Sequence, residues 1–249
     1  MAAMHRTWPA LLLTLAACAP AGAQDFSAGV ARAQEKLDRI VKLIDAVEAR
    51  HARAAEAANW RELFDGKTLA GWTRTEFAGG GGVRVEPDFR GGGPAIVVEA
   101  GDTLSGVTWA GAPPPTMGYE ISLEVMKVEG SDFACGLTFP VADTHASLIL
   151  GGWGGGVVGV SSIDGMDASQ NETTRYMGFT AGRWYALRLR VTPGKIQAWL
   201  DGKPVIDADI TGKKISLRHG EIYRSKPLGL ATFQTIGAYR ALRLRRLGG

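Results

Sequence analysis

The stretch GRWYALRLRVTPGKIQAWLDGKPV, residues 182–205, decides the fold class. Its first half places an apolar residue at every second position from Tyr185 to Val191, with arginines among the residues between them. A period of two with one apolar face is typical of a half-buried strand. A Pro-Gly pair at 193–194 and an Asp-Gly pair at 201–202 favour tight turns. The stretch therefore predicts an antiparallel meander with one side against a core.

The polar side of this meander is expected to be structural. Arg188 and Arg190 lie between the apolar residues of the first strand, and Gln197 and Trp199 face them from the second. A tryptophan ring that covers arginine stems gains packing area and a cation–π contact. We therefore expect Trp199 to stabilise the sheet and to take no part in ligand binding.

The composition of the whole chain agrees with a β-rich globular protein. Its 249 residues are 45% hydrophobic and include 34 glycines and 11 prolines, which suits many short strands joined by tight turns. The net charge is +3, and the arginines near the C-terminus follow a strand pattern without a nucleic-acid-binding motif. We expect a solvated strand face there and no nucleic-acid partner.

The first 23 residues predict export. A basic start precedes a short apolar region, 8–17, which is too short to span a bilayer. The sequence Ala-Gly-Ala at 21–23 resembles a signal-peptidase site, whereas Leu-Ala-Ala-Cys at 15–18 resembles a bacterial lipobox, in which Cys18 would carry a lipid. We expect either a periplasmic or outer-membrane lipoprotein or a secreted protein, which contacts a membrane only through that lipid. The other cysteine, Cys135, lies in an apolar run and is expected to be a buried, unreactive thiol.

Residues 24–58 form the predicted helical part of the chain. From Val30 to Ala58 the apolar residues recur in alternating steps of three and four, which is the seam of a coiled coil. Two interpretations remain open. The helix could join copies of the chain into a homo-oligomer through residues 30–58, or it could be a spacer that precedes or lies on the following domain.

From Asn59 to the end, residues 59–249, the pattern is that of a single β domain. Glycine runs and a triple proline at 113–115 exclude long helices. About a dozen short candidate strands with turn signals between them predict a sandwich or barrel. These strands are expected near 83–86, 94–99, 104–109, 118–128, 132–140, 145–151, 156–163, 173–179, 184–192, 195–201, 204–210, 227–234 and 238–247.

The opening of this domain, LFDGKTLAGW at 63–72, resembles the start of the 3-keto-disaccharide hydrolase domain family. Later segments agree in order, among them YEISLE at 119–124, DFACGL at 132–137 and GLATFQ at 229–234. The likeness covers Asn59 to Leu247. It implies an all-β fold, a concanavalin A-like jelly-roll sandwich of two antiparallel sheets, here preceded by one N-terminal α-helix. The chain differs from the family pattern where a sugar would be handled, at 138–140, 147–152 and 235–236.

The alternation within three successive strands predicts a binding face. Small side chains and one histidine fall on the same side of 132–140, 145–151 and 156–163, and small residues lower the floor of a sheet into a groove. We expect Thr138, Ser147 and Ser161 to contact a carbohydrate. Trp153, in the glycine run 151–156, is either a platform for the C–H face of a sugar ring or a cover for a core edge.

The resemblance also implies a reaction on a 3-keto-glycoside. The ketone at C3 acidifies the hydrogen at C2, a base removes it, the C1 substituent leaves and water adds back. Histidine acts as acid or base near neutral pH, and Asp143 lies beside the same turn as His145. We expect His145 to be the base and Asp143 its partner. Arg175 is expected to stabilise the enolate oxygen by its charge.

The longest polar segment, 161–173, raises the question of a metal. The carboxylates of Asp164, Asp167 and Glu172 could supply oxygens to Ca²⁺, although their spacing is not that of an EF-hand loop. A solvated loop is the alternative, and no other cofactor is indicated.

Three functions are compatible with the sequence. The favoured one is a carbohydrate-active enzyme that acts on 3-keto-glycosides. A non-catalytic glycan-binding module and an envelope scaffolding protein that uses its N-terminal helix are the alternatives.

Overall fold

The computed structural model describes the backbone of residues 21–248 and the side chains of these residues apart from 21–28, 49 and 51–58. The predicted lipobox with Cys18 lies outside the described residues. The chain divides after Ala58 into two units, a helical one and one that contains all the strands described here. Each unit is described by itself.

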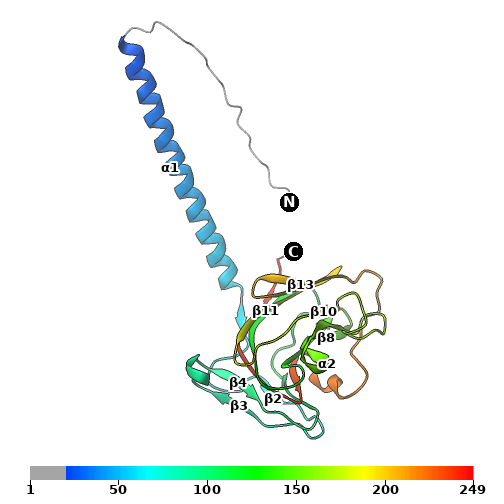
Figure 1. Ribbon diagram of the computed structural model, residues 1–249. Coiled ribbons are helices and arrows are strands. Elements are labelled where there is room, and N and C mark those ends of the chain that lie inside the picture. The colour runs from blue at the N-terminus through cyan, green and yellow to red at the C-terminus, as the bar shows by residue number, and fades with distance from the viewer. Residues whose placement is uncertain (1–20, 249) are drawn as a thin grey trace. The chain divides into compact units, whose positions relative to one another are not determined.

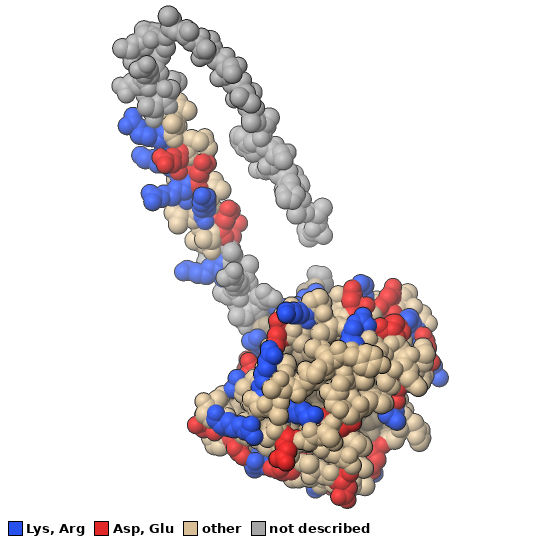
Figure 2. Space-filling view, in the orientation of Figure 1, with Lys and Arg blue, Asp and Glu red and all other residues tan. Residues whose placement is uncertain are grey.

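The first unit is the helix α1 (Ala21–Ala58), which begins several residues before the sequence predicts. Alanine and other strong helix formers fill it, and Gln34 Nε2 donates a hydrogen bond to Asp38 Oδ1 over 3.0 Å, one turn on. Acidic and basic side chains both line its described part (Figure 2). The described apolar residues of the seam are exposed: Val30, Leu37, Ile40, Ile44 and Val47. Within residues 21–248, no helix combines the length and the apolar content that a membrane span needs.

If the seam of α1 joins copies of the chain, which is one of the two interpretations of the sequence, the protein is an oligomer. Replacing Leu37, Ile40 and Ile44 together by serine should then convert an oligomer into monomers, because the apolar contacts along a coiled coil hold its helices together. Light scattering at micromolar concentration measures this. The matched control replaces Val41 and Leu43, which are equally exposed but lie off the seam. A monomeric wild-type protein would rule out the coiled coil.

The second unit is a sandwich of two antiparallel sheets, as predicted (Figure 1). The eight-stranded sheet contains, in spatial order, β13 (Lys203–Asp209), β12 (Lys195–Leu200), β11 (Trp184–Thr192), β6 (Tyr119–Gly130), β15 (Thr235–Arg246), β4 (Ala95–Val98) and β3 (Val83–Glu86), with β1 (Arg61–Glu62) also paired to β15. The seven-stranded sheet contains β10 (Arg175–Tyr176), β9 (Val157–Ser161), β8 (Thr144–Gly151), β7 (Cys135–Val141), β14 (Gly229–Phe233), β5 (Leu104–Trp109) and β2 (Trp72–Arg74). Short helices are α2 (Gly152–Gly155), η1 (Phe89–Gly91) and η2 (Glu221–Ser225).

All the strands expected from the sequence are present, with ends that differ by a few residues. The sequence missed β1 and β2, because strands of two and three residues are too short to show a period. The alternating apolar residues of β11 are buried, as predicted, and so is Cys135, whose thiol pKa is raised by burial.

Two buried tyrosines connect the sheets across the core. Tyr119 of β6 donates its hydroxyl hydrogen bond to the carbonyl of Pro140 over 2.5 Å, and Tyr239 of β15 donates to that of Ala134 over 2.6 Å. Both rings are fully buried. A buried hydroxyl is tolerated only when it has a partner, so these bonds fix how the two sheets face each other.

The opening motif LFDGKTLAGW is structural. Both oxygens of Asp65 are held: Oδ1 accepts from the backbone N–H of Thr68 over 2.7 Å and of Lys67 over 2.8 Å, and Oδ2 accepts from the Thr68 hydroxyl. These bonds lower the pKa of Asp65 to about 2. The indole of Trp72 is buried and donates to the carbonyl of Leu63 over 2.7 Å. The motif therefore closes one turn and anchors it to the core.

The outer face of the eight-stranded sheet carries the predicted arginine and tryptophan contacts. The guanidinium carbon of Arg188 lies 4.0 Å from the ring centre of Trp199, and that of Arg190 lies 5.4 Å away. Between the arginines is Glu120, whose side chain is fully buried. It accepts from Arg190 Nε over 2.6 Å and from Arg245 Nε over 2.7 Å.

Candidate functional site

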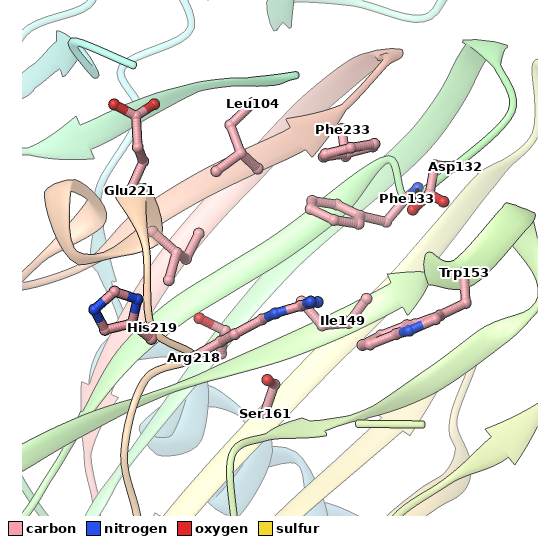
Figure 3. A pocket seen from close by; sticks show the side chains of 12 residues that line it. Leu104, Asp132, Phe133, Ile149, Trp153, Ser161, Arg218, His219, Glu221 and Phe233 are labelled. Atoms are coloured by element: carbon pink, nitrogen blue, oxygen red, sulfur yellow. Dashed lines mark hydrogen bonds between the residues drawn. The ribbon is translucent and has the colours of Figure 1, made fainter. Parts of the chain in front are cut away.

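A cavity of about 320 Å³ lies on the side of the seven-stranded sheet that faces away from the main core (Figure 3). This volume is at the lower end of the range for ligand clefts, roughly 300–1,000 Å³. Its lining comes from β5, β8, β9, β14 and the loops around them: Leu104, Asp132, Phe133, Ser147, Ile149, Trp153, Ser161, Arg218, His219, Glu221, Ile222 and Phe233.

The neighbouring strands β8 and β9 contribute Ser147, Ile149 and Ser161 to the cavity, and β7 lies on the other side of β8. Ser147 of β8 is directly opposite Ser161 of β9 in the antiparallel register. The hydroxyls of Ser147 and Thr138 share a hydrogen bond of 2.9 Å. The three predicted sugar contacts are all buried, Thr138 at 0% and the two serines at 2% exposure, and of the three only the serines line the cavity.

The small residues of this face do not form the open floor that we expected. A Cβ atom on Gly159 would lie 2.6 Å from the carbonyl of Ala168, and one on Gly136 would lie 3.1 Å from the ring of Phe133. The glycines therefore make room for a loop and a side chain that pack on the sheet. Phe133 lies two residues before β7, which begins at Cys135, and its ring lines the cavity.

The polar loop 161–173 brings a carboxylate to the edge of the cavity. Asn171 is buried, and its Nδ2 donates to the carbonyls of Val160, Met166 and Asp167 over 2.8–3.0 Å. The loop so folded places Asp167 Oδ1 against the hydroxyl of Ser161. Asp167 Oδ2 lies 3.2 Å from Nε of Arg218, which is more than 50 residues away in the sequence. One carboxylate thus holds two of the groups that line the cavity.

A rim segment, residues 217–222, supplies three polar groups that the sequence analysis missed. Leu217 and Ile222 are buried in a cluster with Phe77 and Ala231 and so anchor both ends of the segment. The residues between the anchors include Arg218 and His219, which are exposed. Paired backbone hydrogen bonds between Ser162 and Ser216 fix the start of the segment beside β9.

The third polar group of the rim segment is Glu221. Its Oε2 accepts the backbone N–H of Ala78 over 2.9 Å, and its Oε1 lies 3.6 Å from Nε of Arg224. Sequence reasoning found none of these groups, because the run RHGEIYRS has no period and its contacts are made over long range.

Trp153 is exposed at the far end of the cavity from His219 (Figure 3). Its φ is 50°, a left-handed conformation that costs a non-glycine residue about 1–3 kcal/mol. The flanking glycines accept similar angles, and Asp132 Oδ2 fixes the loop by accepting the N–H of Gly154 over 2.7 Å. The guanidinium carbon of Arg218 lies 5.8 Å from the ring centre. Trp153 is therefore 42% exposed at the edge of the cavity, with the guanidinium of Arg218 over its ring.

Comparison with known proteins identifies the family. Residues 59–245 match the model of the 3-keto-alpha-glucoside-1,2-lyase-like domain. The chain belongs to this family. The match spans the whole sandwich and the cavity, and it makes the second unit a carbohydrate-active or carbohydrate-binding domain. No curated protein sequence matches the chain.

Solved structures similar to this lyase-like domain have low sequence identity to it. The apo form of the transglycosylase Crh5 has a TM-score of 0.50 at 11% identity, over 76% of this chain and 84% of that one. The carbohydrate-binding module CBM66 from Bacillus subtilis has a TM-score of 0.46 at 14% identity, over 70% and 95%. Domain 4 of the arabinanase AbnA from Geobacillus stearothermophilus, in complex with arabinotriose, has a TM-score of 0.47 at 15% identity, over 76% and 91%.

The three residues predicted to be catalytic lie outside the lining of the cavity in this lyase-like domain. His145 is on the same face of β8 as Ser147 and two residues along, about 7 Å at the usual strand rise. Burial, and then the positive charge of Lys226, hold the pKa of His145 below its ordinary value. Arg175 lies on the edge strand β10, and its guanidinium donates to the carbonyls of Thr174 and Glu172 over 2.7 and 3.1 Å.

The carboxylates proposed for calcium take separate partners in the lyase-like domain. Asp164 Oδ1 accepts the backbone N–H of Lys214 over 2.8 Å, and Asp167 holds Ser161 and Arg218. Glu172 pairs with Lys213, which holds the pKa of Glu172 below its ordinary value. Across residues 21–248, no three His, Cys, Asp or Glu side chains converge as a metal site would require. These residues do not fit a calcium ion as they are arranged, and the calcium site stays a sequence prediction.

Proposed function

We propose that this chain is an exported enzyme that cleaves 3-keto-glycosides in the cavity beside β8 and β9. Its base removes the hydrogen from C2 of the sugar, and the electron pair forms an enolate with the C3 ketone. The enolate then expels the C1 substituent, which leaves with a proton. Water adds to the resulting double bond and yields the free 3-keto-sugar.

The observation that carries this proposal is the convergence of an imidazole, a guanidinium and two hydroxyls on one cavity with an exposed indole. Trp153 presents an aromatic face to the C–H groups of the sugar ring, and Ser147 and Ser161 bind its hydroxyls. Arg218 offers the positive charge that stabilises an enolate oxygen, and Asp167 holds its guanidinium in place. We assign the role of base to His219, because it lines the cavity.

Replacing His219 by glutamine should lower kcat on a 3-keto-glucoside by roughly 10²–10⁴-fold, the usual contribution of a general base. The affinity for the corresponding unoxidised glucoside, which cannot react, should change little. The matched control is His145→Gln, which removes the other imidazole of this face and should leave the rate within a few fold.

If His145→Gln lowers kcat and His219→Gln does not, the base is His145, as the sequence predicts, and the role of His219 is contradicted. A wild-type protein that binds glucosides but never converts a 3-keto-glucoside would instead be a non-catalytic glycan-binding module. The departures from the family pattern at 138–140 and 235–236 favour that second candidate.

A further inference from the structure

We propose that the apolar half of the cavity binds an uncharged aromatic aglycone, so that the substrates are aryl glycosides and not disaccharides. This inference rests on the proposed function, because it names the group that leaves from C1. The cavity has two chemically different sides, and the sugar and the aglycone occupy one side each.

One side of the cavity offers a ligand only apolar surface. Leu104, Phe133 and Phe233 lie together along it, opposite Ser161 and Arg218 (Figure 3). The rings of Phe133 and Phe233 are tilted by 36° with their centres 6.0 Å apart, within the usual range for packed aromatic pairs. Ile222 of the rim segment extends the same apolar surface.

The charged groups next to this surface already have partners. Asp132 accepts the N–H of Phe133 through Oδ1 and that of Gly154 through Oδ2, over 2.8 and 2.7 Å. Glu221 is held by Ala78 and Arg224. These carboxylates therefore stabilise the walls of the cavity through the contacts that they already make, and the surface between them is apolar.

A second sugar in this half would bury hydroxyl groups against side chains that have no donor or acceptor. A buried hydroxyl without a partner is unfavourable, whereas a flat aromatic ring gains contact area and ring–ring packing in the same place. The opposite side carries polar groups: the hydroxyls of Ser147 and Ser161 and the guanidinium of Arg218. They contact Thr138 and Asp167, but hydroxyl and guanidinium groups form several hydrogen bonds each and can also bind the hydroxyls of one sugar ring. The bond between C1 and the leaving oxygen then lies at the boundary between the two sides.

The test measures binding of unoxidised glycosides, which cannot react, by titration calorimetry. The probes are 4-nitrophenyl glucoside, methyl glucoside and a glucose disaccharide, each in both anomeric forms. We expect the aryl glucoside to bind roughly tenfold more tightly than the methyl glucoside, with the disaccharide no tighter than the methyl glucoside. Phe233→Ala should remove this advantage, so that the aryl glucoside binds no more tightly than the methyl glucoside.

Tyr176→Ala is the matched control, since this tyrosine is 81% exposed on β10 and does not line the cavity. Leu104→Ser is a second lining variant in case Phe233→Ala does not fold, and it should also reduce the advantage of the aryl group. Equal affinities for the aryl and methyl glucosides, tighter binding of the disaccharide, or no binding of any probe would each overturn the aglycone site.

The two proposals fail in distinguishable ways. If the aryl glucoside is preferred but no 3-keto-glucoside is converted, the aglycone site stands and the proposed reaction does not. If 3-keto-disaccharides and aryl 3-keto-glucosides are converted alike and Phe233→Ala changes neither, the reaction stands and the aglycone site does not.

Discussion

Replacing Glu120 by alanine is expected to lower the free energy of unfolding by about 3 kcal/mol, because removing one partner of a buried ion pair leaves the other charges without compensation. The Glu120 side chain has no exposed surface, and Arg190, Arg245 and Arg188 surround it, the last at 3.8 Å. Trp60 packs over Arg245 with its ring centre 4.7 Å from the guanidinium carbon. This loss of stability is at the lower end of the usual range for a broken buried ion pair. The Arg188 and Arg190 side chains are about one-third exposed, so water can solvate their charges in the variant.

Glu124 provides the control for this prediction on the same strand and the same face. It pairs with Arg240, and its side chain is 35% exposed. Glu124→Ala should therefore cost less than about 1 kcal/mol, as exposed ion pairs do. Urea unfolding followed by tryptophan fluorescence measures both variants. Equal decreases in the free energy of unfolding for the Glu120 and Glu124 variants would mean that burial of the Glu120 carboxylate does not matter for stability.

Asn171→Ala should destabilise the protein by about 2–4 kcal/mol, because it removes several buried hydrogen bonds at roughly 0.5–1.5 kcal/mol each. Besides the three carbonyls that its Nδ2 contacts, Oδ1 accepts the backbone N–H and the hydroxyl of Thr173 over 2.9 and 2.5 Å. The loop 161–173 would then loosen from β9, and Asp167 would no longer hold Arg218 at the cavity. We expect weaker glucoside binding as well as a lower urea midpoint.

The exposed neighbour Gln170 is the matched position for this test. Gln170→Ala should leave both the urea midpoint and the affinity close to those of the wild type. Limited proteolysis adds a local measurement, since Asn171→Ala should open cleavage sites within the loop before the sandwich unfolds. If Asn171→Ala lowers stability but leaves the affinity for glucosides intact, the loop does not support the binding site.

The sandwich itself could be predicted from the sequence because its signal is local. In β11 the alternation of apolar residues and arginines predicts both the strand and its buried face. The Pro-Gly pair at 193–194 predicts where the chain reverses direction. The contact between Trp199 and the arginines follows from the same register. That β7, β8 and β9 are neighbours also follows from local features, because strands that are joined by short connections usually pair.

The candidate site was harder to predict from the sequence, because contacts between residues far apart in the chain build it. Arg218 reaches the cavity only because Asp167 holds it from another loop, and no local pattern encodes that pairing. The sequence placed Ser147 and Ser161 at the site because they follow strand alternation, but missed His219, which lies on an irregular segment. It also missed Phe133, because this residue precedes the first residue of β7 and so follows no strand alternation.

The anchoring of the rim segment at Leu217 and Ile222 has a consequence for how this domain can change over generations. Residues 218–220 extend from two buried ends, so they can be exchanged without altering the apolar residues between the two sheets. Duplicated copies of such a gene can therefore gain or lose the proposed reaction through a handful of codons while folding is maintained. The same property makes 218–220 the natural stretch to exchange when the reaction, and not the fold, is to be changed.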